Sequence, residues 1–159
     1  MAPTGTLPAE PPASNDALEL SFRPDPSVYD GRVANNGWLQ ELPKPVTKLT
    51  WDNAALVSPK TAEQLGLSQE VASRGGEHGQ ILSNVIDISL AGSKVTAAAW
   101  ILPGQADGVV VLPLGYGRKK AGYTGPDKGF NAYEVRNPGA FWAPIGGRGQ
   151  EPGATDDPA

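Results

Sequence analysis

Apolar and polar residues alternate most regularly in residues 85–90, where every second residue from Ile86 to Leu90 is a large aliphatic one. A period of two places these side chains on one face of an extended segment, as in a strand with one buried face. Ala91-Gly92-Ser93 is typical of a hairpin turn, and residues 94–101 form the returning strand. The pattern therefore predicts an antiparallel hairpin.

Other segments also have the composition of short strands. Residues 109–112 (VVVL) are typical of a fully buried strand, which ends at Pro113. Upstream, residues 46–51 and 54–57 predict two more strands around Asp52-Asn53. Many short strands separated by Gly and Pro turns predict a mainly β domain whose sheet closes into a barrel.

Residues 58–67 carry the start and stop signals of a two-turn helix. Ser58 is a good N-cap, and Pro59 suits the first helical position. Gly66 supplies the residue of positive φ that commonly ends a helix, and Leu67 can fold back as an apolar contact. One short helix is therefore expected within the β domain.

The composition of the two ends suggests how the chain is organised. Residues 1–26 hold six of the sixteen prolines and few large apolar residues, so they are expected to be a disordered linker. Residues 27–137 would form the barrel, and residues 138–159 a Gly- and Pro-rich acidic tail or linker. Within the barrel segment, residues 68–79 are polar, Gly-rich and aperiodic, so an exposed loop is predicted there.

Composition excludes several kinds of chemistry. The chain has no cysteine, which excludes disulfides, thiolate metal sites and cysteine nucleophiles. Its one histidine, His78, lies in the Gly-rich loop and is expected to be solvated. The net charge of −4 argues against nonspecific binding of nucleic acid. The one dense basic cluster, Arg118-Lys119-Lys120, is expected to be a solvated turn.

Targeting signals are not evident in the sequence. Residues 1–10 lack the basic region and apolar core of a signal peptide. No stretch approaches the roughly 20 apolar residues of a membrane span. If the domain is exported, the signal is expected on another part of the gene or on a partner.

Candidate chemistry is sparse. Gly115-Tyr116-Gly117-Arg118 follows a predicted strand, and glycines there permit close approach of a ligand or another chain, although a tight turn is the simpler interpretation. The motif is not a dinucleotide fingerprint, because no helix and no third glycine follow it. The acidic residues Asp52, Asp87, Asp107 and Asp127 fall at turns or on strand faces, without an acid–base pair. No catalytic residue and no metal ligand is predicted.

Aromatic residues divide into two expected groups. Trp51 and Trp100 lie in strand-like runs and are predicted to be core residues. Trp38 precedes the strands, where packing against another domain is an equal alternative. Aromatic and apolar residues outside the strands predict an interface with a partner domain, formed by Trp38, Leu39, Leu42, Phe130 and Tyr133. Phe141 and Trp142, in the tail, could also dock onto a surface.

Residues 35–55 (NNGWLQELPKPVTKLTWDNAA) form a distinctive run. Further matches follow in order at residues 59–67, 100–104, 114–118 and 129–136, so that the likeness covers residues 22–136. The sequence resembles the molybdopterin-oxidoreductase-like iron–sulfur subunit of alternative complex III and related quinol-oxidising respiratory complexes.

This resemblance implies a fold and a role. The matched segment would be a double-psi β-barrel of the aspartate-decarboxylase-like, molybdopterin-dinucleotide-binding type, with one or two short helices. It would be a non-catalytic domain of an electron-transfer oxidoreductase, serving packing and assembly. Its partners would be a ferredoxin-like iron–sulfur domain and membrane quinol-oxidising subunits, on the periplasmic face of the inner membrane.

The resemblance also implies which cofactors to expect. No cofactor is expected in this chain, since the family's iron–sulfur clusters belong to the neighbouring domain and its subunit lacks the molybdenum cofactor. If a pterin were bound, the contacts would come from Gly115, Tyr116, Gly117 and Arg118, or from Trp51, Asp52 and Asn53. One departure is that the family has a strand soon after the helix, where residues 68–79 are predicted to be a loop.

Two alternative functions remain open from the sequence. The chain could bind the dinucleotide end of the cofactor in a working molybdopterin oxidoreductase. It could also be a free-standing ligand-binding β-barrel unrelated to respiration.

Overall fold

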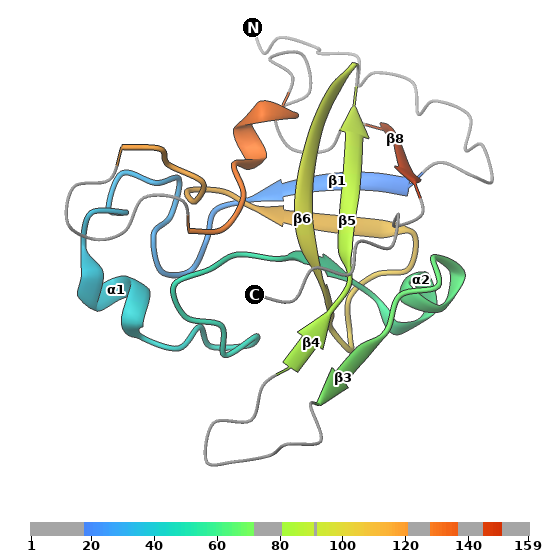
Figure 1. Cartoon of the computed structure of the whole chain (residues 1–159), viewed down its shortest axis with the longest axis horizontal. Coiled ribbons are helices and arrows are strands. Elements are labelled where there is room, and N and C mark those ends of the chain that lie inside the picture. Colours follow the sequence, from blue (N-terminus) through green and yellow to red (C-terminus); the bar gives the residue numbers. More distant parts are fainter. Residues whose placement is uncertain (1–17, 72–80, 91, 121–127, 137–144, 151–159) are drawn as a thin grey trace, which may run out of the picture.

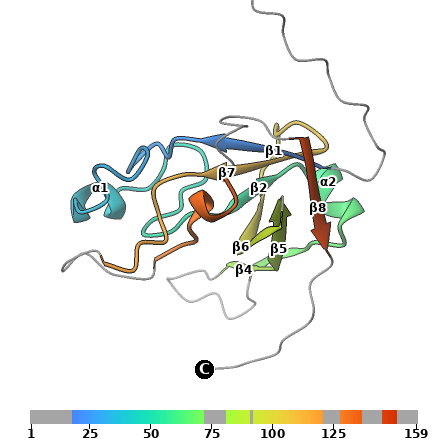
Figure 2. The ribbon, with the colours of Figure 1, turned by 90° about the horizontal axis from the view of Figure 1, so that it is seen from above.

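The computed structural model describes residues 18–71, 81–90, 92–120, 128–136 and 145–150. This part of the chain is mainly β, as predicted, with two short α-helices, α1 (Gly37–Glu41) and α2 (Pro59–Gln64), and a 3-10 turn, η2 (Ala132–Glu134). The two helices lie at opposite ends of the molecule's long axis (Figures 1 and 2).

Six strands form one sheet that curls into a closed barrel. Its order is β1-β7-β2-β6-β5-β8, and β8 returns to pair with β1. The strands are β1 (Leu18–Arg23), β2 (Ala55–Val57), β5 (Val85–Leu90), β6 (Ser93–Ile101), β7 (Val109–Pro113) and β8 (Ile145–Gln150). Two further strands, β3 (Gln69–Val71) and β4 (Ile81–Ser83), pair with each other in a small separate sheet (Figure 1).

The barrel mixes parallel and antiparallel pairs. β1 runs parallel to β7, with Phe22 opposite Leu112, and β2 runs parallel to β6, with Leu56 opposite Trp100. The remaining neighbours, β2 with β7, β5 with β6 and β8, and β8 with β1, are antiparallel. As a result, the chain leaves β1 and β7 and enters β2 at the same end of the barrel.

The core lies inside the barrel and is built from side chains that alternate along the strands. Phe22 and Leu112 are among the largest fully buried side chains, and Val57 joins them from β2. The hairpin prediction is confirmed, because β5 is buried at Ile86, Ile88 and Leu90 and pairs with β6 through Leu90 and Ser93. Apolar burial of this kind contributes about 25 cal/mol per Å² removed from water.

Helix α2 is confirmed with both of its ends. The Ser58 side chain accepts from the Thr61 amide at 3.0 Å. At the other end Gly66 has φ +65°, and the Leu67 amide donates to the Ala62 carbonyl at 2.8 Å. Together with the Gly66-to-Glu63 bond of 3.1 Å, this is a Schellman motif.

The predicted boundaries of the barrel are wrong at both ends. β1 lies within the segment predicted to be a linker, yet Leu20 and Phe22 are 2% and 1% exposed. β8 lies within the predicted tail and closes the barrel. The proline content of residues 1–26 concealed the short alternation Leu18-Glu19-Leu20-Ser21-Phe22, which is a strand pattern of period two.

Two other expectations also differ from the structure. Residues 46–51 form the end of a turn and an irregular segment rather than a strand, because Lys48 and Trp51 have φ of 61° and 58°, which no strand accommodates. Residues 69–71, predicted to belong to a loop, form β3. His78 and the rest of that predicted loop, residues 72–79, lie outside the described residues, as do Phe141 and Trp142.

Phe22→Ala tests whether β1 is a structural strand. The substitution removes a buried ring that lies next to β7, so the free energy of unfolding should fall by about 3–5 kcal/mol. Ser21→Ala, on the half-buried neighbouring position, should change it by less than about 0.5 kcal/mol. Urea denaturation measures both values. Equal, small effects would mean that residues 18–23 do not contribute to the folded barrel.

Ser58→Ala tests the N-cap of α2 and its link to the turn before β7. The Ser58 hydroxyl also lies 2.6 Å from Asp107 Oδ1, and this hydrogen bond is the main reason that the pKa of Asp107 is lowered. The substitution should cost about 1–2 kcal/mol and raise the pKa of Asp107, which NMR titration of the carboxyl follows. Gln64→Ala, at an exposed position of α2 that makes no contact with Asp107, is the matched control for the loss of stability. An unchanged pKa of Asp107 would contradict the assignment.

Candidate functional site

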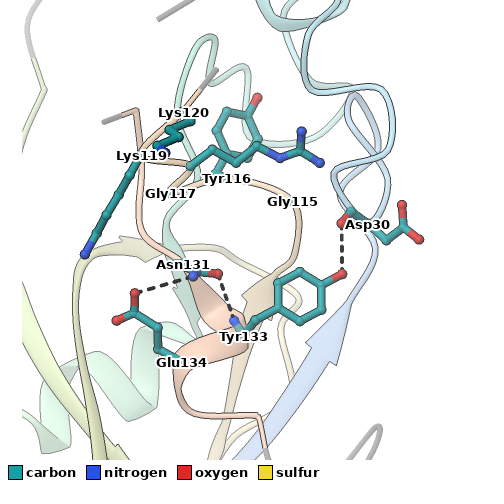
Figure 3. A pocket seen from close by; sticks show the side chains of 10 residues that line it. Asp30, Gly115, Tyr116, Gly117, Lys119, Lys120, Asn131, Tyr133 and Glu134 are labelled. Atoms are coloured by element: carbon teal, nitrogen blue, oxygen red, sulfur yellow. Dashed lines mark hydrogen bonds between the residues drawn. The ribbon is translucent and has the colours of Figure 1, made fainter. Parts of the chain in front are cut away.

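Loops from three parts of the chain form an open cleft (Figure 3), at the end of the barrel where the chain leaves β1 and β7. The cleft has a volume of about 620 Å³. One wall is the segment after β7, and the others come from the loop after β1 and from η2. Its lining residues are Asp30, Gly115, Tyr116, Gly117, Arg118, Lys119, Lys120, Asn131, Tyr133 and Glu134.

Two glycines let the backbones of these loops touch. Gly115 has φ +101°, and a Cβ there would lie 2.8 Å from the Gly31 amide nitrogen. Gly117 has φ +75°, and a Cβ there would overlap the backbone of Asn131. The glycines of the Gly115-Tyr116-Gly117-Arg118 motif thus permit a close approach by neighbouring loops of the same chain, and the approach of a ligand or another chain stays a prediction.

The lining of the cleft carries both positively and negatively charged side chains. The Tyr133 hydroxyl donates to the Asp30 carbonyl at 2.8 Å (Figure 3). The Arg118 guanidinium donates to the Gly31 carbonyl, so both side chains bind the loop after β1. The hydrogen bond from Arg32 lowers the pKa of Asp30 to about 2. Lys119 and Lys120 are exposed, and the Glu134 carboxylate lies 3.4 Å from the Asn131 amide.

Behind the cleft, the buried ammonium of Lys44 joins three loops. Its Nζ donates to the Asp52 carbonyl and to the Tyr116 hydroxyl, the latter at 3.2 Å. It also lies 3.7 Å from Asp25 Oδ2 and 4.7 Å from the centre of the Tyr116 ring. The other oxygen of Asp25 accepts from the Ser27 and Val28 amides at 2.8 and 3.1 Å.

Burial governs the protonation of this cluster. It lowers the pKa of Lys44, and the negative charges of Asp25 and Asp52 act in the opposite direction. Burial also raises the pKa of Tyr116, with a further upward contribution from the same two carboxylates. The raised pKa keeps Tyr116 a neutral phenol at neutral pH, and its hydroxyl accepts a hydrogen bond from Lys44 Nζ.

Asn53 holds the end of β7 against the segment before η2. Its Nδ2 donates to the carbonyls of Pro113 and Phe130, at 2.8 and 3.2 Å, and its Oδ1 accepts from the Phe130 amide at 2.9 Å. Asn53 is 2% exposed, so these bonds satisfy a buried amide.

The two groups of predicted pterin contacts have different positions. Gly115, Tyr116, Gly117 and Arg118 line the cleft. Trp51, Asp52 and Asn53 do not line it and instead belong to the loop behind it. Trp51 and Trp100 are half-buried, whereas both were expected in the core.

The predicted interface residues are also divided. Trp38 and Leu42 are 84% and 64% exposed, and Tyr133 is 39% exposed. Leu39 is half-buried. Phe130 is 7% exposed and packs in the main core, so its ring cannot contribute to an exposed surface.

Asp25 and Lys44 were not identified from the sequence, and the structure places them between the loops behind the cleft. Asp25 was included in the predicted linker, although Asp25-Pro26-Ser27 is a turn signal, and the Asp25 side chain does bond the backbone two and three residues on. For Lys44 no local signal exists, because its partners Asp52 and Tyr116 are brought to it by the fold.

Comparison with known proteins finds no protein family whose pattern matches this sequence and no matching curated protein. Among the described residues, no group of three or more His, Cys, Asp or Glu side chains is arranged to hold a metal ion. No helix in the same part of the chain is long and apolar enough to cross a membrane.

Tyr116→Phe tests the buried cluster. Because the pKa of Tyr116 is raised above 10.0, the folded state retains the phenol proton where the unfolded state loses it. The contribution of Tyr116 to stability should therefore fall as the pH rises above about 10. In an ultraviolet titration of phenolate absorbance, the last tyrosine to ionise should be missing from Tyr116→Phe. Tyr29→Phe, at an exposed position, should retain that step, and its loss there instead would contradict the assignment.

Proposed function

We propose that this chain is a non-catalytic β-barrel domain of an electron-transfer subunit in a quinol-oxidising respiratory complex, where it serves packing and assembly. Its partners would be a ferredoxin-like iron–sulfur domain and the membrane subunits of the same complex, on the periplasmic face of the inner membrane. The resemblance of residues 22–136 to that subunit motivates the proposal.

The barrel is compatible with the fold that this resemblance implies. A double-psi β-barrel is a closed six-stranded barrel in which two pairs of parallel strands are interleaved. Here β1 is parallel to β7 and β2 is parallel to β6, and β7 lies between β1 and β2. These pairings support the double-psi arrangement, which is the finer fold assignment we propose.

The main observation in favour of the proposed packing role is the orientation of α1. Trp38 and Leu42 are four residues apart, a spacing that places them on one side of the helical turn, and both are exposed. The buried residue of α1 is the polar Gln40, whose Nε2 donates to the Ala34 carbonyl at 2.7 Å. A helix that turns its apolar side outward leaves that side available to another protein surface.

A second candidate function is favoured by the cleft. Its glycine-rich wall with Arg118, Lys119 and Lys120 could contact an anionic group, as the dinucleotide end of a pterin cofactor would require. Against this, Asp30 and Glu134 stand in the same lining, and Arg118 already binds the Gly31 carbonyl. Mass spectrometry of pterin released from the purified complex separates the two functions, because the packing role requires none.

Trp38→Ala and Leu42→Ala should weaken assembly while leaving the fold intact. Both side chains are mostly exposed, so each substitution should change the free energy of unfolding by less than about 0.5 kcal/mol. As central aromatic residues of an interface commonly do, Trp38 should contribute about 2 kcal/mol or more to binding. Thermal melts measure the first effect, and co-purification of the full chain with the iron–sulfur domain measures the second.

Leu82→Ala is the matched control. Leu82 lies on β4, away from α1, and is 59% exposed, close to the 64% of Leu42. It should assemble like the wild type. Equal weakening by Leu82→Ala would show that the α1 surface is not the interface. A large loss of thermal stability in Trp38→Ala would show that Trp38 serves the fold.

A further inference from the structure

A second hollow lies beside the buried cluster and shares no lining residue with the cleft. It has a volume of about 240 Å³. Its wall is almost entirely apolar, with aliphatic side chains from β2 and β7 and prolines from the loops around them. Representative lining residues are Pro24, Pro26, Pro45, Leu49, Leu56 and Val111.

The walls of this pocket are held in place without a ligand. The proline rings fix the backbone φ and leave no N–H at those positions. The loop after β1 is closed by paired Asp25 and Tyr29 backbones, with two hydrogen bonds of 2.9 Å. On the other side, the Lys44 amide donates to the Leu49 carbonyl at 3.2 Å. A preformed pocket avoids the cost of ordering loops upon binding.

The charged residues that line the pocket are Arg23, Asp25 and Lys44. Asp25 and Lys44 are both buried and form an ion pair with each other, so their charges largely cancel. Arg23 is exposed at the end of β1, and no acidic side chain in the described part of the chain forms an ion pair with it. The pocket therefore combines an apolar interior with one available guanidinium.

We propose that this pocket binds a small apolar carboxylate, with the apolar group inside and the carboxylate on Arg23. The volume is below the roughly 300–1,000 Å³ of pockets for drug-sized ligands, so a single ring or a branched chain fits and a dinucleotide does not. Arg is suited to the carboxylate because its planar donors match both oxygens. The carboxylate can belong to a free metabolite or to the C-terminal residue of a partner chain.

The test compares phenylacetate with its neutral analogue phenylacetamide, titrated into the full chain and followed by NMR shifts of the amides around the pocket. Phenylacetate should bind saturably at one site and at least about tenfold more tightly than the amide, because a charge-assisted hydrogen bond is lost in the amide. A peptide ending in phenylalanine with a free carboxylate, compared with its amidated form, distinguishes a partner chain from a metabolite as the source.

Two variants localise the binding. Arg23→Gln should remove the preference for the carboxylate, whereas Arg32→Gln, at an arginine that does not line the pocket, should retain it. Val46→Trp, at a lining residue that is 70% exposed, should weaken both ligands by obstructing the pocket. Absence of saturable binding by the wild type, equal affinity for acid and amide, or unchanged binding by Arg23→Gln or Val46→Trp would each overturn the proposal.

Discussion

The arrangement of the loops where the chain leaves β1 and β7 depends on the buried amino group of Lys44. Lys44 is 5% exposed, and a charge so far from water is stable only if its donors are satisfied. Its hydrogen bonds go to the Asp52 carbonyl and the Tyr116 hydroxyl, and the Asp25 carboxylate, 3.7 Å away, supplies the opposite charge. These three partners come from three separate loops. Since each partner comes from a different loop, the position of any one of them constrains the other two. Tyr116 of this cluster lines the cleft, and Asp25 and Lys44 line the apolar pocket, so both hollows depend on it for part of their walls.

Strand direction explains why these loops meet. Because β1 and β7 are parallel, the chain leaves both at one end of the barrel, and because β2 is antiparallel to β7, the chain enters β2 at that same end. The loop after β1 supplies Asp25 and Asp30, the segment after β7 supplies Gly115 to Arg118, and the segment before β2 supplies Lys44 and Asn53. A purely antiparallel barrel of consecutive hairpins would have distributed these segments over both ends. The mixed topology is thus the reason that the polar and cationic groups gather in one place.

The sequence predicts the parts of this fold that are encoded locally. The capped helix at Ser58–Gly66 and the hairpin of β5 and β6 depend on residues that are neighbours in the chain, and both are present. β1 was missed because its few apolar residues lie among prolines and gain their burial only from β7. The turn at Lys48 and Trp51 was missed because two non-glycine residues adopt positive φ there, which no local composition signals. The Gly115–Arg118 motif could be found from sequence because its residues are consecutive. Asp30 and Tyr133, which line the cleft with it, come from distant segments and could not be predicted to lie there.

The pairing of β1 with β7 also has a consequence for synthesis of the chain. Leu20 and Phe22 lie opposite Val110 and Leu112, about ninety residues later, so the first strand has no partner until most of the domain has been made. Because the ribosome adds roughly 5–20 residues per second, several seconds or more pass between the synthesis of β1 and that of β7. During that time these two apolar side chains lack their native contacts. Contacts so distant in sequence also slow folding, because a long loop must close before they form. The barrel therefore cannot assemble in the order in which it is translated, and β1 is a segment that a ribosome-associated chaperone would meet early.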